Sequence, residues 1–254
     1  MLSVMVDGRA IEYRMVPGDA LATPTLVFLH EGLGSAALWR DFPDKVAQRL
    51  GARALIYSRF GYGHSDGLIA KREPTFMHDE ALQVLPALLD NLGIENPVLV
   101  GHSDGASIAL IHAAAARRPV RAVAVMAPHV FVEPVTVESI ARIRATYGDG
   151  PLRERLAKYH ARVDDAFLGW ADAWLDPRFL SWSIEDLIPA ITAPLLMIQG
   201  RNDEYGTMQQ LDRIAARATA PLTRLELDDC GHSPHRDREP TCIDAITKFV
   251  AALP

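Results

Sequence analysis

Hydrophobic residues in this chain gather in short continuous runs rather than alternating strictly with polar residues. Six of these runs follow one another along the sequence: Thr25–Leu29, Arg53–Tyr57, Pro97–Val100, Ala122–Met126, Pro194–Ile198 and Thr223–Leu227. Continuous apolar runs of this length are typical of strands that are covered on both faces. A loop and then a helical pattern follow each run, which predicts an α/β fold with a mainly parallel central sheet and helices on both faces.

The helical patterns have apolar residues at the spacing of a helix face. We expect helices over Ala37–Leu50, His78–Leu92, Ser103–Arg117, Met208–Ala218 and Glu239–Ala252. The beginning of the chain has a different pattern, in which Val4–Val6 and Ile11–Val16 flank Asp7-Gly8. Because glycine tolerates the positive φ of a tight hairpin, we expect the chain to open with two antiparallel strands.

Residues 131–190 interrupt the alternation of strands and helices. This stretch has helical periodicity without a clear strand, and it contains Trp170, Trp174 and Trp182. We interpret it as a helical cap inserted after the sixth strand, with residues 1–130 and 191–254 forming the core. Open α/β sheets bind ligands at the carboxyl ends of their strands, so the tryptophans are expected to cover a pocket. Alternatively, they are only the core of a small helical subdomain.

Composition and charge exclude several classes of function. The chain has 254 residues, of which 49% are hydrophobic, and is long enough for one large core. Its net charge is -6 with basic residues scattered among acidic ones, so neither nucleic acid nor an anionic membrane is an expected partner. No run approaches a membrane span and no signal peptide is evident, which favours the cytoplasm. Cys230 and Cys242 are interpreted as ordinary thiols.

The stretch Gly-His-Ser-Asp-Gly occurs twice, at Gly63–Gly67 and at Gly101–Gly105. Only the second copy follows an apolar run and leads into a helix of small residues, which is the context of a G-x-S-x-G nucleophile elbow. Ser103 would then hold a sparsely populated backbone conformation, which the flanking glycines permit because they lack a Cβ. The first copy has no helix after it and is soon followed by Pro74, so Ser65 is predicted to be a loop serine.

A serine hydroxyl is almost never ionised at neutral pH and needs a base, which in turn needs an orienting group. Two later strands end in residues of these types. Gly200–Asp203 forms a turn with an acid after one strand, and Gly231-His232 follows the last strand. All three groups are therefore expected on loops at one edge of the sheet, in the order serine, acid, histidine.

With these motifs, and with His30–Ser35 and Arg59–Ser65 after the third and fourth strands, the chain resembles the α/β-hydrolase superfamily over essentially its whole length. The resemblance implies an α/β-hydrolase fold. It also implies that Ser103 is the nucleophile, that His232 is the general base and acid, and that Asp203 orients the imidazole.

The resemblance further implies an oxyanion hole that includes the backbone N–H of Asp104. We assign the second donor to Gly32, on the loop after the third strand. Removing one such donor typically costs on the order of 10²–10³ in rate. This chain departs from the commoner pattern at two positions, because Glu31 stands in the usual glycine place and Ala106 stands where a further glycine is frequent.

Other acids and histidines offer rival assignments. Asp228 and Asp229 precede His232 within one loop, and they are also typical turn formers. His232 and His235 have a spacing that zinc sites use, but no third ligand is suggested, so neither a metal nor another cofactor is expected. Four histidines lie near the site by topology and are interpreted as hydrogen-bonding wall residues: His30, His64, His102 and His129. The substrate-binding residues are predicted to be His30, Glu31, His129, Trp170 and Trp174.

Asp104 also has a side chain whose role the sequence leaves open. One interpretation is that its carboxylate only caps the helix after the elbow, where the helix dipole favours an acid. An amino-acid ester hydrolase of this superfamily has a similar Ser-Asp-Gly elbow and binds the substrate's ammonium with the corresponding acid. The second interpretation is therefore a cationic substrate group.

These inferences favour a cofactor-independent serine hydrolase that cleaves a small carboxylic ester or related acyl compound through an acyl-enzyme on Ser103. The same three residues would also suit a carbon–carbon bond hydrolase, an enol-lactonase, a thioesterase, an aminopeptidase or an amino-acid ester hydrolase. An alternative from another class is a catalytically silent relative that binds a ligand or partner. The oligomeric state and the natural substrate are left open.

Overall fold

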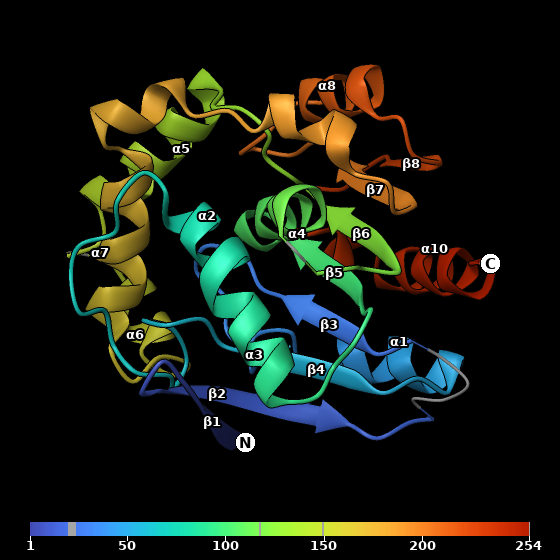
Figure 1. Ribbon diagram of the computed structural model, residues 1–254. Coiled ribbons are helices and arrows are strands. Elements are labelled where there is room, and N and C mark those ends of the chain that lie inside the picture. Colours follow the sequence, from blue (N-terminus) through green and yellow to red (C-terminus); the bar gives the residue numbers. More distant parts are fainter. Residues whose placement is uncertain (20–23, 117, 149, 254) are drawn as a thin grey trace.

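The computed structural model describes residues 1–19, 24–116, 118–148 and 150–253, and one eight-stranded sheet runs through it (Figure 1). The strand order is β1-β2-β4-β3-β5-β6-β7-β8. The strands are β1 Leu2–Val6, β2 Arg9–Val16, β3 Leu26–Leu29, β4 Ala54–Tyr57, β5 Val98–His102, β6 Ala122–Met126, β7 Leu195–Gly200 and β8 Leu222–Leu227. Each predicted apolar run therefore overlaps a strand.

The sheet is antiparallel at its beginning and parallel elsewhere. β1 and β2 form a hairpin with Val6 opposite Arg9, and both turn residues, Asp7 and Gly8, have positive φ as expected. β2 pairs with β4 in the antiparallel sense, and the strands from β4 through β8 pair in parallel. The carboxyl ends of β5, β7 and β8 consequently meet at the same edge of the sheet.

Both faces of the sheet are covered, which explains the continuous apolar runs. Alternate strand residues such as Leu26 and Phe28 join one core cluster with α1 and α10, while Val27 and Leu29 join the other with α3, α4 and α8. The helices of the sheet layers are α1 Phe42–Leu50, α2 Phe76–Asp79, α3 Leu85–Asn91, α4 Asp104–Ala115, α8 Gln209–Arg217, α9 Pro234–Asp237 and α10 Glu239–Ala251.

Two expected helices differ from the structure. The first begins at Phe42 rather than Ala37, with Pro43 in its first turn, where a missing N–H costs nothing. The expected helix His78–Leu92 is divided into α2, the π-helical turn η1 Glu80–Val84, and α3. Pro86, in the first turn of α3, has no backbone N–H and so removes one hydrogen-bond donor from the helix. The preceding turn, η1, has the wider π-helical hydrogen-bond pattern. The expected helix end at Arg117 lies outside the described residues.

The described residues between β6 and β7 form helices joined by loops, with one isolated bridge between Phe131 and Ser183 and no strand. Its elements are α5 Pro134–Ala145, α6 Leu152–Leu156, α7 Val163–Trp174 and the 3-10 helices η2 Pro177–Ser181 and η3 Glu185–Ala190. In Figure 1, α5, α6 and α7 stand together at the left of the sheet. We call residues 131–190 the inserted segment.

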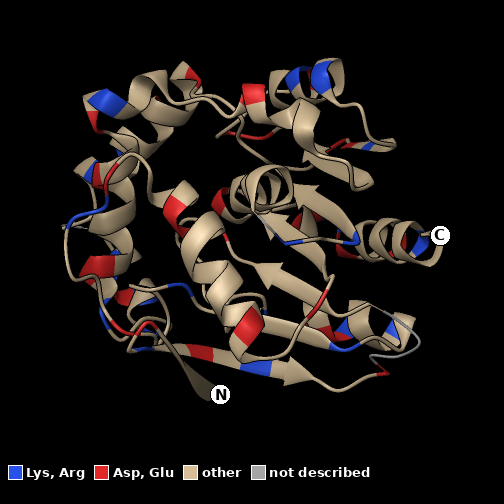
Figure 2. Cartoon of the chain, in the orientation of Figure 1, with Lys and Arg blue, Asp and Glu red and all other residues tan. Residues whose placement is uncertain are grey.

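Acidic and basic residues are interspersed along the chain rather than separated (Figure 2). Several of them pair across helices of the inserted segment, where Arg144 contacts Asp172 and Arg153 contacts Asp164, both at 2.8 Å. Such exposed pairs contribute little to stability individually. In the part of the chain that the structure describes, no helix has both the length and the apolar character needed to cross a bilayer.

Candidate active site

Ser103 occupies the sharp turn between β5 and α4. Its φ of 53° and ψ of -119° lie in a region that residues with a side chain rarely adopt. The turn is held because the Ser103 N–H donates to the Met126 carbonyl of β6 at 2.9 Å, while the Ser103 carbonyl accepts from Ala106 at 2.9 Å. The strand and the helix therefore fix a strained residue with its side chain at the sheet edge.

The two glycines around this serine are required by close backbone contacts. A Cβ on Gly101 would lie 2.4 Å from the carbonyl oxygen of Gly105. A Cβ on Gly105 would lie 2.1 Å from the carbonyl oxygen of Leu29 in the neighbouring strand β3. Backbone atoms cannot move aside as the end of a side chain can, so the elbow needs glycine at both places.

The structure brings Ser103, His232 and Asp203 together. His232 Nε2 lies 2.9 Å from Ser103 Oγ, and His232 Nδ1 lies 2.8 and 3.0 Å from the two carboxylate oxygens of Asp203. Since a carboxylate accepts, the neutral ring carries its proton on Nδ1, and Nε2 is free to accept the proton of Oγ. The three residues follow β5, β7 and β8 on separate loops, as the sequence predicts.

Electrostatics favours an ionised Asp203 beside His232. Burial alone raises the pKa of Asp203, but the positive charge and hydrogen bond of His232 outweigh it, so this pKa lies below its ordinary value. Burial alone lowers the pKa of His232, but Asp203 outweighs it and raises this pKa above its ordinary value. The imidazole is thus prepared to hold a proton when it receives one.

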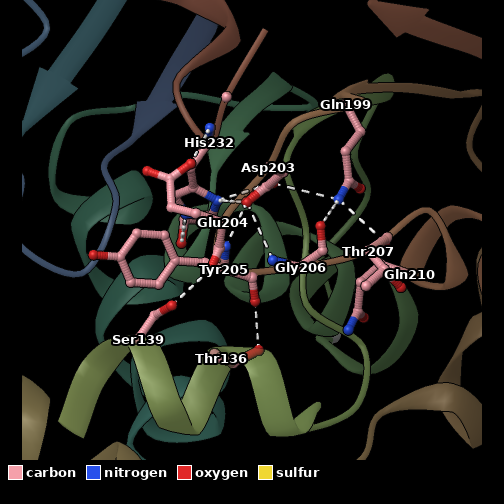
Figure 3. Close-up of polar contacts among 12 residues, drawn as sticks. Thr136, Ser139, Gln199, Asp203, Glu204, Tyr205, Gly206, Thr207, Gln210 and His232 are labelled. Carbon is pink, nitrogen blue, oxygen red and sulfur yellow. Dashed lines mark hydrogen bonds and ion pairs between the residues drawn. The ribbon is translucent and has the colours of Figure 1, made fainter. Parts of the chain in front are cut away.

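The loop that carries Asp203 is held from several directions (Figure 3). Asp203 Oδ1 accepts the backbone N–H groups of Tyr205 and Gly206 at 2.8 and 3.1 Å, and Gln199 donates to Oδ2 at 3.3 Å. A Cβ on Gly200, just before the loop, would lie 2.1 Å from the Cys230 carbonyl oxygen. This close approach places the loop after β7 beside the loop after β8, which carries His232.

Helix α5 of the inserted segment supports the same loop from below in Figure 3. Thr136 donates to the carbonyl of Tyr205, and Ser139 donates to the carbonyl of Glu204 at 2.8 Å. Glu133, just before α5, accepts from the backbone and the hydroxyl of Thr207 at 2.9 and 2.6 Å. The inserted segment therefore helps to position Asp203.

Gly32 and Asp104, each with a backbone N–H group, line the same cavity as Ser103. Neither N–H donates to another residue in the described part of the chain. Gly32 also lies directly against an indole, since a Cβ there would be 2.0 Å from Trp170 Nε1. These two donors can serve a developing negative charge on a substrate oxygen.

The cavity above Ser103 has a volume of about 240 Å³. Besides Ser103, His232 and the two N–H donors, it is lined by four of the predicted substrate-binding residues, Glu31, His129, Trp170 and Trp174. It is further lined by Leu33, His102, Thr136, Ile140, Tyr205, Ser233 and Arg236. Sequence reasoning did not identify Thr136, Ile140, Tyr205 and Arg236, because only the packing of distant segments brings them here.

A comparison of the sequence with protein families shows to which family the chain belongs. The model of the alpha/beta hydrolase family matches residues 26–245. The chain belongs to the alpha/beta hydrolase family. It is a hydrolase, and the fold predicted from its sequence is confirmed.

Curated relatives and solved structures agree with this assignment. The sn-1-specific diacylglycerol lipase ABHD11 of Mus musculus is 25% identical over 281 residues, covering 95% of this chain and 85% of that protein. A proline iminopeptidase of Lactobacillus helveticus is 34% identical over 101 residues, covering 39% of this chain and 33% of that protein. The enol-lactonase from Burkholderia xenovorans LB400 has a TM-score of 0.80 at 20% identity, covering 98% of this chain and all of that one.

Two histidines predicted to line the site of this hydrolase lie elsewhere. His30 is fully buried and is not among the residues that line the cavity. Its Nδ1 lies 2.7 Å from the Glu31 carbonyl, and its Nε2 accepts the backbone N–H of Arg59 at 3.1 Å. His64 is exposed, and its N–H donates to Glu12 at 3.0 Å. Their positions depend on how the loop after β4 folds back, which local sequence does not specify.

The carboxylate of Asp104 is buried, and its contacts are with Trp174 and Arg59 rather than with α4. Its Oδ1 accepts from the indole N–H of Trp174 at 3.1 Å, and its Oδ2 lies 3.8 Å from Nη2 of the buried Arg59. Burial raises the pKa of Asp104 above its ordinary value, although Arg59 opposes this shift. The carboxylate thus already has a donor and a cation inside the protein. Sequence reasoning missed Arg59, since nothing near it signals its burial.

The structure also shows where the alternative acids, Asp228 and Asp229, and the second histidine of the possible zinc pair, His235, lie. Asp228 and Asp229 are exposed and pair with Arg201 and Arg238, away from the imidazole. His235 packs its ring against Trp39 at 4.8 Å between centroids, and burial holds its pKa well below the ordinary value. Within the described residues, no group of three or more His, Cys, Asp or Glu side chains is arranged to hold a metal ion.

Proposed function

We propose that this hydrolase cleaves a small carboxylic ester or related acyl compound through an acyl-enzyme on Ser103. The observation that carries the proposal is the chain of contacts from Ser103 Oγ to His232 Nε2 at 2.9 Å and from His232 Nδ1 to Asp203 at 2.8 Å. Nucleophile, base and orienting acid at these separations are the requirements for activating a serine hydroxyl.

The reaction follows from the positions of the protons. Ser103 Oγ attacks the substrate carbonyl carbon while its proton passes to His232 Nε2, and Asp203 stabilises the resulting imidazolium. The carbonyl oxygen becomes an oxyanion that accepts from the N–H groups of Gly32 and Asp104. When this intermediate collapses, His232 gives its proton to the leaving alcohol. Water then attacks the acyl group with His232 as base, and Ser103 recovers its proton.

The cavity supports a small substrate. Its volume of about 240 Å³ is below the roughly 300–1,000 Å³ of most sites for drug-sized ligands. We therefore expect kcat/KM to fall as the acyl chain of a p-nitrophenyl ester series is lengthened from acetate to palmitate. A rate that rises with chain length would contradict the proposed size limit.

We further propose that residues 131–190 act as the cap, with residues 1–130 and 191–254 as the core. Support comes from Trp170 and Trp174, which line the cavity from this segment. Trp182 does not line it and stacks on Phe179 at 5.2 Å, as a residue of a subdomain core would. The cytoplasmic location and the absence of a nucleic-acid partner remain predictions from the sequence.

Covalent labelling tests the assignment of the nucleophile. A fluorophosphonate should modify the protein once, and mass mapping of the digested product should place the label on Ser103. The Ser103→Ala variant should not be labelled, whereas Ser65→Ala should be labelled like the wild type. A label on Ser65, or no label on the folded wild type, would overturn the proposed function.

A further inference from the structure

The peptide unit that joins Glu31 to Gly32 has two polar groups with different surroundings. It is trans, so its carbonyl oxygen and its N–H point in opposite directions. The N–H belongs to Gly32 and is the second oxyanion donor of the proposed function. The carbonyl belongs to Glu31 and is held by the protein. The donors that hold this carbonyl therefore set the direction in which the Gly32 N–H points.

Three donors converge on the Glu31 carbonyl oxygen. Arg59 Nη2 donates to it at 2.9 Å, the Gly34 N–H donates at 3.1 Å, and His30 Nδ1 lies 2.7 Å away. A carbonyl can only accept, so His30 Nδ1 carries a proton. His30 Nε2 accepts the backbone N–H of Arg59 at 3.1 Å, which requires a bare nitrogen there. One neutral tautomer of His30 thus satisfies both contacts.

Arg59 supplies the charged donor of this set. Its Nη2 also donates to the His30 carbonyl at 3.3 Å, and it lies 3.4 Å from His30 Nδ1 because both atoms share the Glu31 oxygen. A charged donor makes a stronger hydrogen bond than a neutral one, and a hydrogen bond to a carbonyl polarises the groups linked to it. The guanidinium therefore both orients the Gly32 N–H and strengthens it as a donor.

The same guanidinium reaches the residue that supplies the other donor. Arg59 Nη2 lies 3.8 Å from Oδ2 of Asp104, whose backbone N–H is the first oxyanion donor of the proposed function. A carboxylate beside an oxyanion hole opposes the negative charge that develops there, and a cation beside that carboxylate offsets the effect. Arg59 thus lies between the two residues of the oxyanion hole.

The burial of Arg59 is costly for stability. Its side chain is 1% exposed, and its Nε and Nη1 are buried without a hydrogen-bond partner in the part of the chain that the structure describes. Buried polar groups without partners cost free energy, and native structures contain few of them. Such a group is expected where the reaction, rather than stability, requires it.

We propose that Arg59 and His30 are positioning residues of the oxyanion hole, which hold the Glu31–Gly32 peptide unit so that its N–H is directed at the developing charge. The proposal rests on the proposed function. It also gives a role to His30, a residue predicted to bind the substrate that does not line the cavity. Both residues then act on the rate of the reaction through a backbone group, without touching the substrate.

The first test compares two arginines beside the ring of Tyr62. Their guanidinium carbons lie 4.7 Å (Arg59) and 4.9 Å (Arg72) from the ring centre, but Arg72 donates to the carbonyl of Phe60 at 2.8 Å, whereas Arg59 donates to that of Glu31. Arg59→Met should lower kcat and kcat/KM for p-nitrophenyl acetate by the same factor, on the order of 10–100-fold, because the oxyanion exists only after attack. Arg72→Met should leave both unchanged. Equal losses in the two variants, or a raised KM at unchanged kcat, would overturn the proposal.

A second pair of variants keeps every charge in place and is used if Arg59→Met does not fold. The amide N–H of an asparagine lies close to the position of the histidine Nδ1–H, whereas leucine has no donor. His30→Leu should lower kcat and kcat/KM together by up to about tenfold, the worth of one neutral hydrogen bond. His30→Asn should recover most of this loss. The same loss in both variants would show that the donor to Glu31 is not what matters, and would overturn the proposal.

A transition-state analogue separates positioning from general damage. A trifluoromethyl ketone adds to the nucleophilic serine, and the resulting oxyanion occupies the hole. Its dissociation constant should rise in Arg59→Met by the factor by which kcat/KM falls, and should stay at the wild-type value in Arg72→Met. An unchanged dissociation constant in Arg59→Met would contradict the proposal.

A last measurement does not depend on turnover. In proton–nitrogen NMR spectra, the amide resonance of Gly32 should shift in Arg59→Met, because its peptide unit loses the charged donor at the carbonyl, and should stay in place in Arg72→Met. If the wild type neither turns over esters nor is labelled at Ser103, but Gly32 responds in this way, the proposed function fails and the positioning stands. A Gly32 resonance that neither variant shifts, or that both shift equally, overturns the positioning itself.

Discussion

The stretches Gly63–Gly67 and Gly101–Gly105 contain the same five residues, and the serines in them have the same exposed fraction of 6%. Their hydroxyl groups have different partners. Ser103 Oγ lies 2.9 Å from the imidazole of His232, whereas Ser65 Oγ is used entirely by backbone groups. The five residues and their burial are the same in both copies, and the partner of the hydroxyl distinguishes Ser103 from Ser65 in the structure.

Ser65 has a structural role that suits its hydroxyl. It donates to the Ser58 carbonyl at 2.6 Å and accepts the N–H of Glu12 at 2.8 Å, which joins the loop after β4 to strand β2. Its proton is donated to a backbone carbonyl rather than to an imidazole. The prediction of a loop serine at this position is confirmed.

The backbone differs as well. In the first copy the residue with positive φ is the glycine Gly63, at 56°, where the conformation is free of strain. In the second copy it is the serine itself, Ser103, at 53°. The same five residues thus store strain at the serine only where a strand ends and a helix begins.

The largest expected effect comes from removing the hydroxyl that has the imidazole partner. Ser103→Ala should lower kcat by on the order of 10⁶-fold with little change in KM, because the acyl-enzyme can no longer form. Steady-state kinetics with a p-nitrophenyl ester, after active-site contaminants are excluded by labelling, would measure it. A loss of less than tenfold would mean that the two serines are not distinguished by catalysis.

A smaller effect is expected from changing the group that orients the imidazole. Asp203→Asn should lower kcat by about 10⁴-fold, since an amide no longer selects the tautomer with Nε2 free. The acid limb of the remaining activity should also move to lower pH, because Asp203 raises the pKa of His232. A full pH profile tests both. If the acid limb stayed at the same pH, Asp203 would not be the carboxylate that raises the pKa of His232.

The corresponding last glycines of the two copies offer a matched pair. A Cβ on Gly105 would meet the backbone carbonyl of Leu29 at 2.1 Å. A Cβ on Gly67 would meet only side-chain atoms, of Arg162 and Asp165 at 2.6 Å, and side chains can shift. Gly105→Ala should lower the free energy of unfolding by at least about 3 kcal/mol and Gly67→Ala by about 1 kcal/mol. Urea unfolding measures both, and equal losses would contradict the backbone argument.

The smallest effect on kcat is expected at the structural serine, Ser65. Ser65→Ala leaves the N–H of Glu12 and the carbonyl of Ser58 without their partner, and it should cost about 1–3 kcal/mol of unfolding free energy. Its kcat should equal that of the wild type when both proteins are fully folded. Thermal unfolding and ester hydrolysis at low temperature separate the two quantities. A large loss of kcat in Ser65→Ala would contradict the conclusion that only Ser103 acts in catalysis.

Much of the fold and the three central site residues followed from local patterns. Apolar runs, the glycines of the elbow and an acid or histidine after a strand are each readable within a few residues, as at Ser103 and His232. What local patterns do not specify is which distant segments meet. The inward carboxylate of Asp104, the buried Arg59 and the support of Asp203 by α5 all depend on such tertiary packing.

The attachment of α5 to the Glu204–Thr207 loop has a consequence for engineering substrate scope. Replacing residues 131–190 by the equivalent stretch of a relative would exchange Trp170 and Trp174, which line the cavity. It would at the same time remove the hydrogen bonds of Thr136 and Ser139 to the loop that carries Asp203. Viable chimeras must therefore transplant residues 131–190 together with the Glu204–Thr207 loop, and recombination between relatives is expected to keep these two segments together.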